Sequence, residues 1–200
     1  MIKISLVTTT INYPKLLLEY AKDFSKNNKK GSFELLIIIA GDKKTPDKTK
    51  QLAKNIKKKY KINCEYLDEK KQNEFLKNFK NLKSFLPWNS VQRRNVAILK
   101  SLQEKCDLIV TIDDDNFLKT TNFIQSHLFN IKKTRGKIVN SSSNWFNICQ
   151  FLNENSNNNF FHRGFPISKK KLKNNFQLSK QKNFKVAANA GLWLNDPDVD

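Results

Sequence analysis

The sequence is poor in the residues that mark small secreted proteins and membrane-spanning proteins. Its three cysteines, Cys64, Cys106 and Cys149, lie far apart, so they form neither a disulfide framework nor the paired spacing of a zinc site. No apolar run approaches the roughly 20 residues that a membrane-spanning helix needs. The first residues enter a strand pattern directly and lack the apolar stretch of a signal peptide. We therefore expect a cytoplasmic protein.

Acidic residues are scarce as well. The chain has 18 aspartate and glutamate residues against 37 lysine and arginine residues, which gives a net charge of +19. This charge favours anionic partners such as nucleic acid, an acidic membrane surface or phosphorylated small molecules. The excess is mostly lysine, which occurs in the same runs as asparagine. AT-rich coding bias at solvated positions also produces this pattern. A functional basic surface and coding bias both remain open.

Only five glycines occur, and none forms a phosphate loop or a dinucleotide-binding fingerprint. The chain also lacks the signature of a serine or cysteine catalytic triad. A length of 200 residues with 38% hydrophobic content is nevertheless enough for a real core. We expect a single domain over residues 1–200.

Apolar strand patterns alternate with amphipathic helix patterns in the first half of the chain. Such β-α-β-α-β order predicts an α/β fold, with a mostly parallel, Rossmann-like sheet covered by helices on both faces. The strands are expected at Ile2–Thr9, Phe33–Ile39 and Ile62–Leu67, and the helices after Pro14 and from Thr45 to about Tyr60.

The following residues predict a helix and a loop within 68–85, and then a second helix capped by Asn89 with Gln92. We expect that second helix to bury Val91, Ile98 and Leu102. After a central strand at 108–112, the pattern predicts a helix over 123–131, a strand over 137–140, an exposed lysine-rich segment over 169–185 and an apolar run over 186–194.

The stretch from Asp107 to Phe117, DLIVTIDDDNF, is the most informative part of the chain. Leu108–Ile112 has the composition of a strand buried on both faces, and it ends in Asp113, Asp114 and Asp115. Adjacent carboxylates repel one another, so a divalent cation such as Mn²⁺ or Mg²⁺ would explain them. Asp113 and Asp115 are spaced to point to one side and are the expected metal ligands, with Asp114 beside them in the ligand site. The alternative is an acidic turn that faces solvent.

Other polar residues are expected near these acids. Arg93 and Arg94 lie in the first turn of a predicted helix, where positive charge costs about 0.3–1 kcal/mol against the helix dipole. A bound phosphate would offset that cost, whereas the alternative is that both arginines project into water. Thr9 and Asp42 follow the first two strands, at the edge where a nucleotide lies in a doubly wound sheet.

Several of these motifs together resemble a known fold. An early VTTTIN turn, an RRN at a helix start and a strand ending in TIDDD are similar to the GT-A glycosyltransferases. In that fold a D-x-D motif holds Mn²⁺ or Mg²⁺ and the diphosphate of a sugar nucleotide. The RGFPIS segment at 163–168 and the GLWLNDPD segment at 191–198 resemble the reversibly glycosylated polypeptides, a family that includes the UDP-arabinopyranose mutases.

This resemblance implies an enzyme of carbohydrate metabolism that binds a nucleotide-diphosphate sugar, with a UDP-sugar favoured. It assigns catalytic roles to Asp115 and to Arg163, where the family's self-glycosylated arginine falls. A second family arginine is Lys170 here, and the family's final tyrosine is Val199. The sequence stops inside that last motif at Asp200, so either the native protein continues or the chain is a compact relative.

Three functions therefore remain open. The enzyme is a mutase or self-glycosylating protein, or it is a transferase that uses a glycan or lipid acceptor. The third possibility is a basic nucleic-acid-binding module, whose affinity would fall steeply with salt. Three aspartates at the centre of the predicted site argue against a groove that binds nucleic acid phosphates, so we expect no specific nucleic acid partner. Contact with an acidic membrane surface is a further expectation from the charge.

Overall fold

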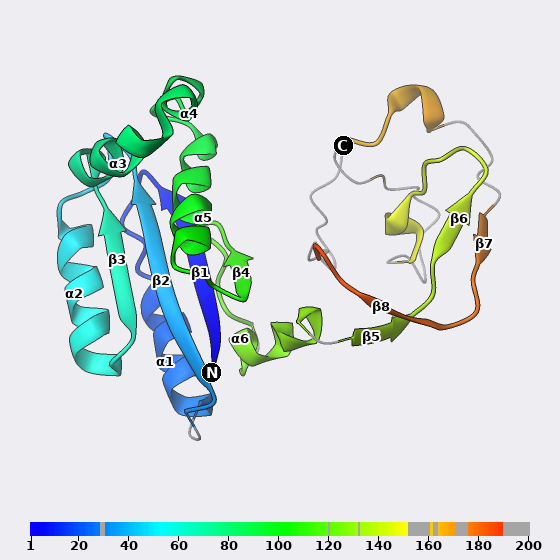
Figure 1. Cartoon of the computed structure of the whole chain (residues 1–200), viewed down its shortest axis with the longest axis horizontal. Helices are drawn as coiled ribbons and strands as arrows, with labels where there is room; N and C mark the ends of the chain where they lie inside the picture. Colours follow the sequence, from blue (N-terminus) through cyan, green and yellow to red (C-terminus); the bar gives the residue numbers. More distant parts are fainter. Residues whose placement is uncertain are drawn as a thin grey trace. The chain divides into compact units, whose positions relative to one another are not determined.

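The computed structural model describes residues 1–28, 31–119, 121–131, 133–151, 161, 164–170 and 176–189. The chain divides into two compact units, Met1–Leu128 and Phe129–Asp200, where the sequence predicted one domain (Figure 1). Each unit has its own strands. No helix of the described residues is long and apolar enough to cross a membrane.

The first unit is built on a four-stranded, all-parallel sheet in the order β3-β2-β1-β4. This confirms the predicted α/β class and the parallel pairing. The strand before the three aspartates, expected at the centre, lies at the edge of the sheet among the described residues, because it pairs with β1 alone. The strands are β1 (Ile2–Thr10), β2 (Phe33–Gly41), β3 (Asn63–Leu67) and β4 (Leu108–Thr111).

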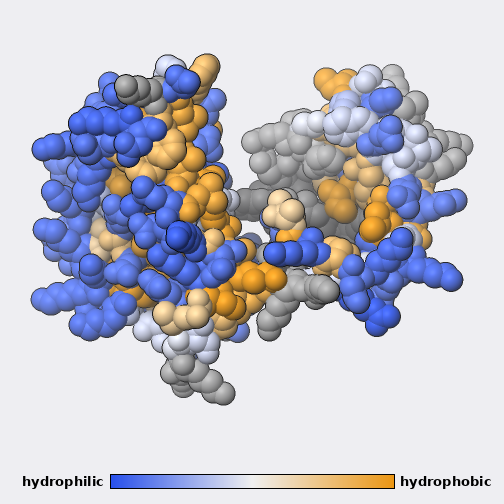
Figure 2. Space-filling model, viewed as in Figure 1, coloured by the Kyte–Doolittle hydropathy of each residue, from blue (hydrophilic) through white to orange (hydrophobic). Residues whose placement is uncertain are grey.

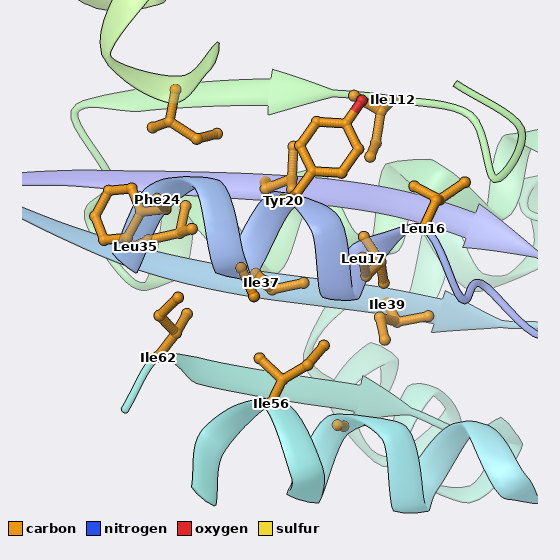
Figure 3. Close-up of a cluster of buried hydrophobic side chains, with 14 of the residues drawn as sticks. Leu16, Leu17, Tyr20, Phe24, Leu35, Ile37, Ile39, Ile56, Ile62 and Ile112 are labelled. Carbon is orange, nitrogen blue, oxygen red and sulfur yellow. The ribbon is translucent and has the colours of Figure 1, made fainter. Parts of the chain in front are cut away.

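Helices cover both faces of this sheet. On one face, α1 (Leu17–Asn27) and α2 (Lys48–Tyr60) pack apolar side chains onto β1 and β2. Figure 3 shows this cluster, in which Tyr20 and Phe24 of α1 and Ile56 of α2 lie against β-strand residues such as Ile37. The opposite face is covered by α5 (Arg94–Gln103), whose Val96 and Ala97 are fully buried. The two buried clusters place the sheet between two helical layers.

The start of α5 differs from the sequence prediction. A 3₁₀ turn, η2 (Val91–Arg93), precedes the helix, and Ser90 rather than Asn89 caps it by accepting a hydrogen bond from the Gln92 backbone N–H at 3.2 Å. The tighter winding of this turn changes the phase of the side chains that follow. Of the three residues expected to be buried, Val91 is 75% exposed and Leu102 is 58% exposed, so those two predictions are wrong. Ile98 is half-buried and packs against the core.

Short helical segments fill the rest of the first unit. The predicted helix and loop within 68–85 is a chain of three short helices, and the helix predicted over 123–131 is an α-turn followed by a 3₁₀ turn. These segments are α3 (Glu69–Phe75), η1 (Leu76–Phe79), α4 (Lys80–Phe85), α6 (Phe123–Ser126) and η3 (His127–Asn130), which ends just past the boundary of the unit.

The second unit contains two small antiparallel ladders. β5 (Lys133–Gly136) pairs with β8 (Lys182–Lys185), and β6 (Val139–Ser141) pairs with β7 (Phe176–Leu178). The lysine-rich segment at 169–185 thus contributes two strands, β7 and β8, which the sequence did not predict. The 3₁₀ turns η4 (Ile148–Phe151) and η5 (Ile167–Lys169) complete the described elements of this unit.

Candidate functional site

The carboxyl ends of β1, β2 and β4 meet at one edge of the sheet because the strands are parallel. From β1 the chain passes outward through β2 to β3, and it then returns to place β4 on the other side of β1. The boundary between β1 and β4 is therefore a topological switch point, where open α/β sheets bind ligands. The residues after β4 at this boundary are Asp113, Asp114 and Asp115.

Asp114 joins the two sides of the switch point. Its carboxylate accepts hydrogen bonds from the Thr10 hydroxyl and, at 3.3 Å, from the side-chain amide of Asn12. Asn116 stabilises the same turn, because its side-chain oxygen accepts the backbone N–H of Asp113 at 2.9 Å. The Tyr20 hydroxyl of α1 donates to the Asn116 carbonyl at 2.7 Å, and burial raises the pKa of Tyr20 to about 12. The acidic turn is thus held by β1 and α1.

Asp113 is paired with a cation from the opposite helical layer. Its carboxylate accepts from the guanidinium of Arg94, the first residue of α5. The Asp113 side chain is 52% exposed and the Arg94 side chain is 25% exposed. The Arg94 Nε is buried and has no hydrogen-bond partner among the described residues. One predicted anion-binding arginine and one predicted metal ligand are therefore in direct contact.

Asp115 is exposed, with a 3.4 Å contact between its carboxylate and the side-chain amide of Asn116. Within the described ranges, no three histidine, cysteine, aspartate or glutamate side chains converge to hold a metal ion. Magnesium commonly uses only one or two protein carboxylates and completes its shell with water and substrate phosphates. The roles of Asp113 and Asp115 as metal ligands, and the metal itself, stay predictions.

Arg93, which the sequence placed beside a diphosphate, lies in the core and is 1% exposed. Its guanidinium donates to the side-chain oxygen of Gln72 and, at 2.9 Å, to the carbonyl of Leu86. It also stacks on Trp88, with 3.7 Å between the guanidinium carbon and the ring centroid. Since internal acceptors occupy this side chain, we leave Arg93 out of the candidate site.

Asp42, predicted near a nucleotide, is likewise buried and holds a loop in place. It is 7% exposed, and its carboxylate accepts backbone N–H groups from Lys43 at 2.7 Å, Asn89 at 2.9 Å and Ser90 at 3.3 Å. It therefore fastens the loop before α5 to the end of β2. The Thr9 hydroxyl donates to the Ala40 carbonyl at 3.0 Å and thus contacts the neighbouring strand.

Besides Arg94, the acids contact Thr10, Asn12 and Asn116, none of which was named as a predicted site residue. Strand alternation could have identified Thr10, because neighbouring residues of β1 face opposite sides of the sheet. Thr10 lies on the same side as the buried Leu6, toward α1, and its hydroxyl reaches Asp114. Asn116 directly follows the acids, but its role depends on a turn geometry that the sequence does not specify.

Arg163 and the segment 191–198 lie outside the described residues. Nearby, Gly164 has a φ of 82°, a conformation that favours glycine, and Phe165 is 2% exposed against Trp145 and Phe161. Lys170 Nζ lies 5.4 Å from the centre of the Phe161 ring. The RGFPIS segment therefore contributes an apolar anchor within the second unit.

The structure thus brings together Arg94, Asp113 and Asp114 at the switch point, with Asp115 beside them in the same turn. No protein-family model and no curated protein matches this chain.

Proposed function

We propose that the first unit binds a nucleotide-diphosphate sugar together with Mn²⁺ or Mg²⁺, as GT-A glycosyltransferases do, and that the protein transfers or isomerises the sugar. The observation that supports this proposal best is the position of the acidic turn. It lies at the switch point of a parallel sheet, and an arginine at the start of α5 contacts it. A purely structural acidic turn would not require either feature.

The charges at this edge favour a metal–diphosphate complex over either component alone. Three carboxylates would repel a free diphosphate, and of the three only Asp113 has an arginine partner among the described residues. A divalent cation between Asp113 and Asp115 would offset the remaining negative charge, and Arg94 with the N-terminus of α5 would contact the phosphates. In a transfer reaction these cations would stabilise the leaving diphosphate.

The Arg94–Asp113 ion pair predicts that metal and diphosphate bind cooperatively. Metal alone has to compete with Arg94 for Asp113, and diphosphate alone has to compete with Asp113 for Arg94. When both bind, the arginine turns to the phosphate and the carboxylate turns to the metal, so both charges keep a partner. Each ligand therefore raises the affinity for the other by the same factor.

Thermal-shift assays with UDP, UDP-sugars and other sugar nucleotides, with and without Mn²⁺, test this proposal. At a ligand concentration of about one hundred times Kd, the stabilisation is about 2.7 kcal/mol, which corresponds to a shift of roughly 5–10 °C. The shift should require nucleotide and metal together. If no sugar nucleotide raises the melting temperature in the presence of Mn²⁺ or Mg²⁺, the proposal is wrong.

Variants assign the effect to the site. Asp115→Ala should abolish the metal-dependent part of the shift, and Arg94→Ala should weaken binding of the diphosphate. Asp47→Ala is the matched control, since Asp47 is an exposed carboxylate next to α2 whose side chain makes no capping hydrogen bond. Equal shifts in Asp115→Ala and in the control would remove the acidic turn from the site.

Intact-protein mass spectrometry distinguishes the two enzymatic possibilities. A mass gain after incubation with a sugar nucleotide, lost in Arg163→Ala, would indicate the self-glycosylating or mutase type. Turnover that occurs only when a glycan or lipid acceptor is added would indicate a transferase. This choice depends on the sequence resemblance alone, because Arg163 lies outside the described residues.

A further inference from the structure

Helix α2 and the residue that ends it carry an unusual concentration of positive charge. Seven lysines and no acidic residue lie between Lys48 and Lys61, and all seven lysines are exposed. In α1, by contrast, Lys22 and Lys26 are balanced by Glu19 and Asp23. Coding bias would add lysine at solvated positions of both helices, so it does not explain the difference between them.

The lysines form a continuous surface because of their spacing. Lys50, Lys54 and Lys57 recur at intervals of four and three residues and lie on one side of the helix, with Lys58 next to them. Together with their neighbours they extend along a helix of 13 residues, or about 20 Å. We call the four residues Lys50, Lys54, Lys57 and Lys58 the lysine face.

The first unit does not neutralise this charge. No ion pair among the described residues includes a member of the lysine face. The nearest acidic residue in sequence, Asp47, is at the N-cap and makes no capping hydrogen bond through its side chain. Lysines four residues apart repel each other and destabilise the helix. An anionic partner would remove this repulsion.

The chemistry of the surface favours a lipid headgroup layer over nucleic acid. Figure 2 shows a largely hydrophilic surface over α2, and the exposed residues between its lysines are polar, such as Gln51 and Asn55. Proteins that bind single-stranded nucleic acid combine positive charge with exposed aromatic platforms. The two aromatic rings that contact the α2 lysines, Tyr13 and Tyr60, are only half-exposed, and each already has a lysine ammonium over its ring. Anionic lipid attracts lysine clusters through charge alone.

We propose that the lysine face docks the protein on membrane surfaces that contain anionic lipid. The apolar side of α2, with Leu52, Ala53 and Ile56, is already buried in the core of the unit. The helix therefore adsorbs to the headgroups without inserting into the acyl chains, unlike an amphipathic anchor. Such binding is reversible and weakens as salt increases.

Co-sedimentation of the full chain with phosphatidylcholine vesicles, with and without phosphatidylserine, tests this proposal. The wild-type protein should bind only the anionic vesicles. The variant K50E/K54E/K57E/K58E should lose about a hundredfold or more in affinity. A matched control, K22E/K26E/K70E/K83E, makes the same change in net charge at exposed lysines outside α2 and should bind within a few-fold of wild type. Circular dichroism checks that both variants are folded.

Three results would overturn the proposal. The first is no binding to anionic vesicles at physiological salt, and the second is an equal loss in both variants, which would indicate net charge without a specific surface. The third is saturable RNA binding that the lysine-face variant abolishes while vesicle binding is unchanged. The assay contains no sugar nucleotide, so its outcome is independent of the proposed enzymatic function.

Discussion

At the scale of single residues, Arg93 shows how one buried cation can hold several elements together. It contacts Gln72 of α3, the Leu86 carbonyl and the ring of Trp88, and Gln72 in turn donates to the carbonyls of Gly41 and Leu67. Burial lowers the pKa of Arg93, and the nearby Asp42 carboxylate opposes that change. The network connects the ends of β2 and β3 to the start of α5.

Substitution of Arg93 should therefore reduce stability. We expect Arg93→Ala to lower the free energy of unfolding by about 2–4 kcal/mol, because it leaves buried acceptors without donors and opens a cavity. Arg93→Lys should recover little of this loss, since an ammonium group cannot reproduce the guanidinium fork. Urea denaturation measures the effect. Arg94→Ala, which removes a partly exposed ion pair, is the control and should cost less than about 1 kcal/mol.

The different roles of these adjacent arginines could not be predicted from the sequence. Both lie at the start of the same helix, so the local sequence predicts the same role for both. The acceptors that bury Arg93 come from residues 72 and 86, and the partner of Arg94 is residue 113. Only the folded sheet brings these distant positions together.

His127 gives the first unit a predicted dependence on pH. Burial lowers its pKa below the ordinary value of 6.5, and its Nε2 has no hydrogen-bond partner in the described part of the chain. The unfolded state therefore takes up a proton before the folded state does as the pH falls. The contribution of neutral His127 to the free energy of unfolding is therefore fully present above about pH 6.5. It is lost as the pH drops through that value toward the folded-state pKa.

Urea denaturation at pH 7.5 and pH 5.5 tests this expectation. The wild-type protein should be less stable at the lower pH, and His127→Gln should show a smaller difference between the two. Glu104 does not contribute to this difference. Hydrogen bonds from Lys100 and Lys3 lower its pKa from the ordinary value of 4.5, so it titrates below the two pH values compared. An identical pH dependence in the variant would show that His127 is not the responsible group.

At the scale of elements, the first two apolar strands and the helix after Pro14 were predicted well. β1 and β2 each begin at the predicted residue and end two residues or fewer past the predicted end, because their composition leaves no alternative to burial. The buried face of α5 was predicted only in part, since Leu102 is exposed, Ile98 is half-buried, and Val96 and Ala97 are fully buried. Periodicity assumes one helix type throughout, and Val91 lies in a 3₁₀ turn outside the α-helix.

The acidic turn was only partly predictable for a related reason. Its position at the carboxyl end of a strand follows from the sequence, and the structure confirms that position. The directions of its side chains do not follow, since Asp113 contacts Arg94 of α5 whereas Asp114 contacts Thr10 at the end of β1. Those directions depend on the turn at Asn116 and on the Tyr20 hydroxyl from α1. Site residues outside regular elements therefore require the structure.

At the scale of the whole molecule, the switch point, the lysine face and both buried clusters all belong to the first unit. Each cluster packs one face of the sheet, and every buried residue in them lies at or before Ile124. A segment of this length is within the usual size of an independent domain. We therefore expect residues 1–128 to fold without the rest of the chain.

A protein ending at Leu128 makes this expectation testable with one built-in reporter. Trp88 is the only tryptophan before residue 129, and it stacks on Arg93 at the junction of β2, α3 and α5. Urea unfolding followed by Trp88 fluorescence should coincide with unfolding followed by circular dichroism, as a two-state transition requires. Separate transitions would show that the first unit needs residues 129–200. If the transitions coincide, the same fragment should keep the metal-dependent binding of sugar nucleotides, because the switch point is complete within it.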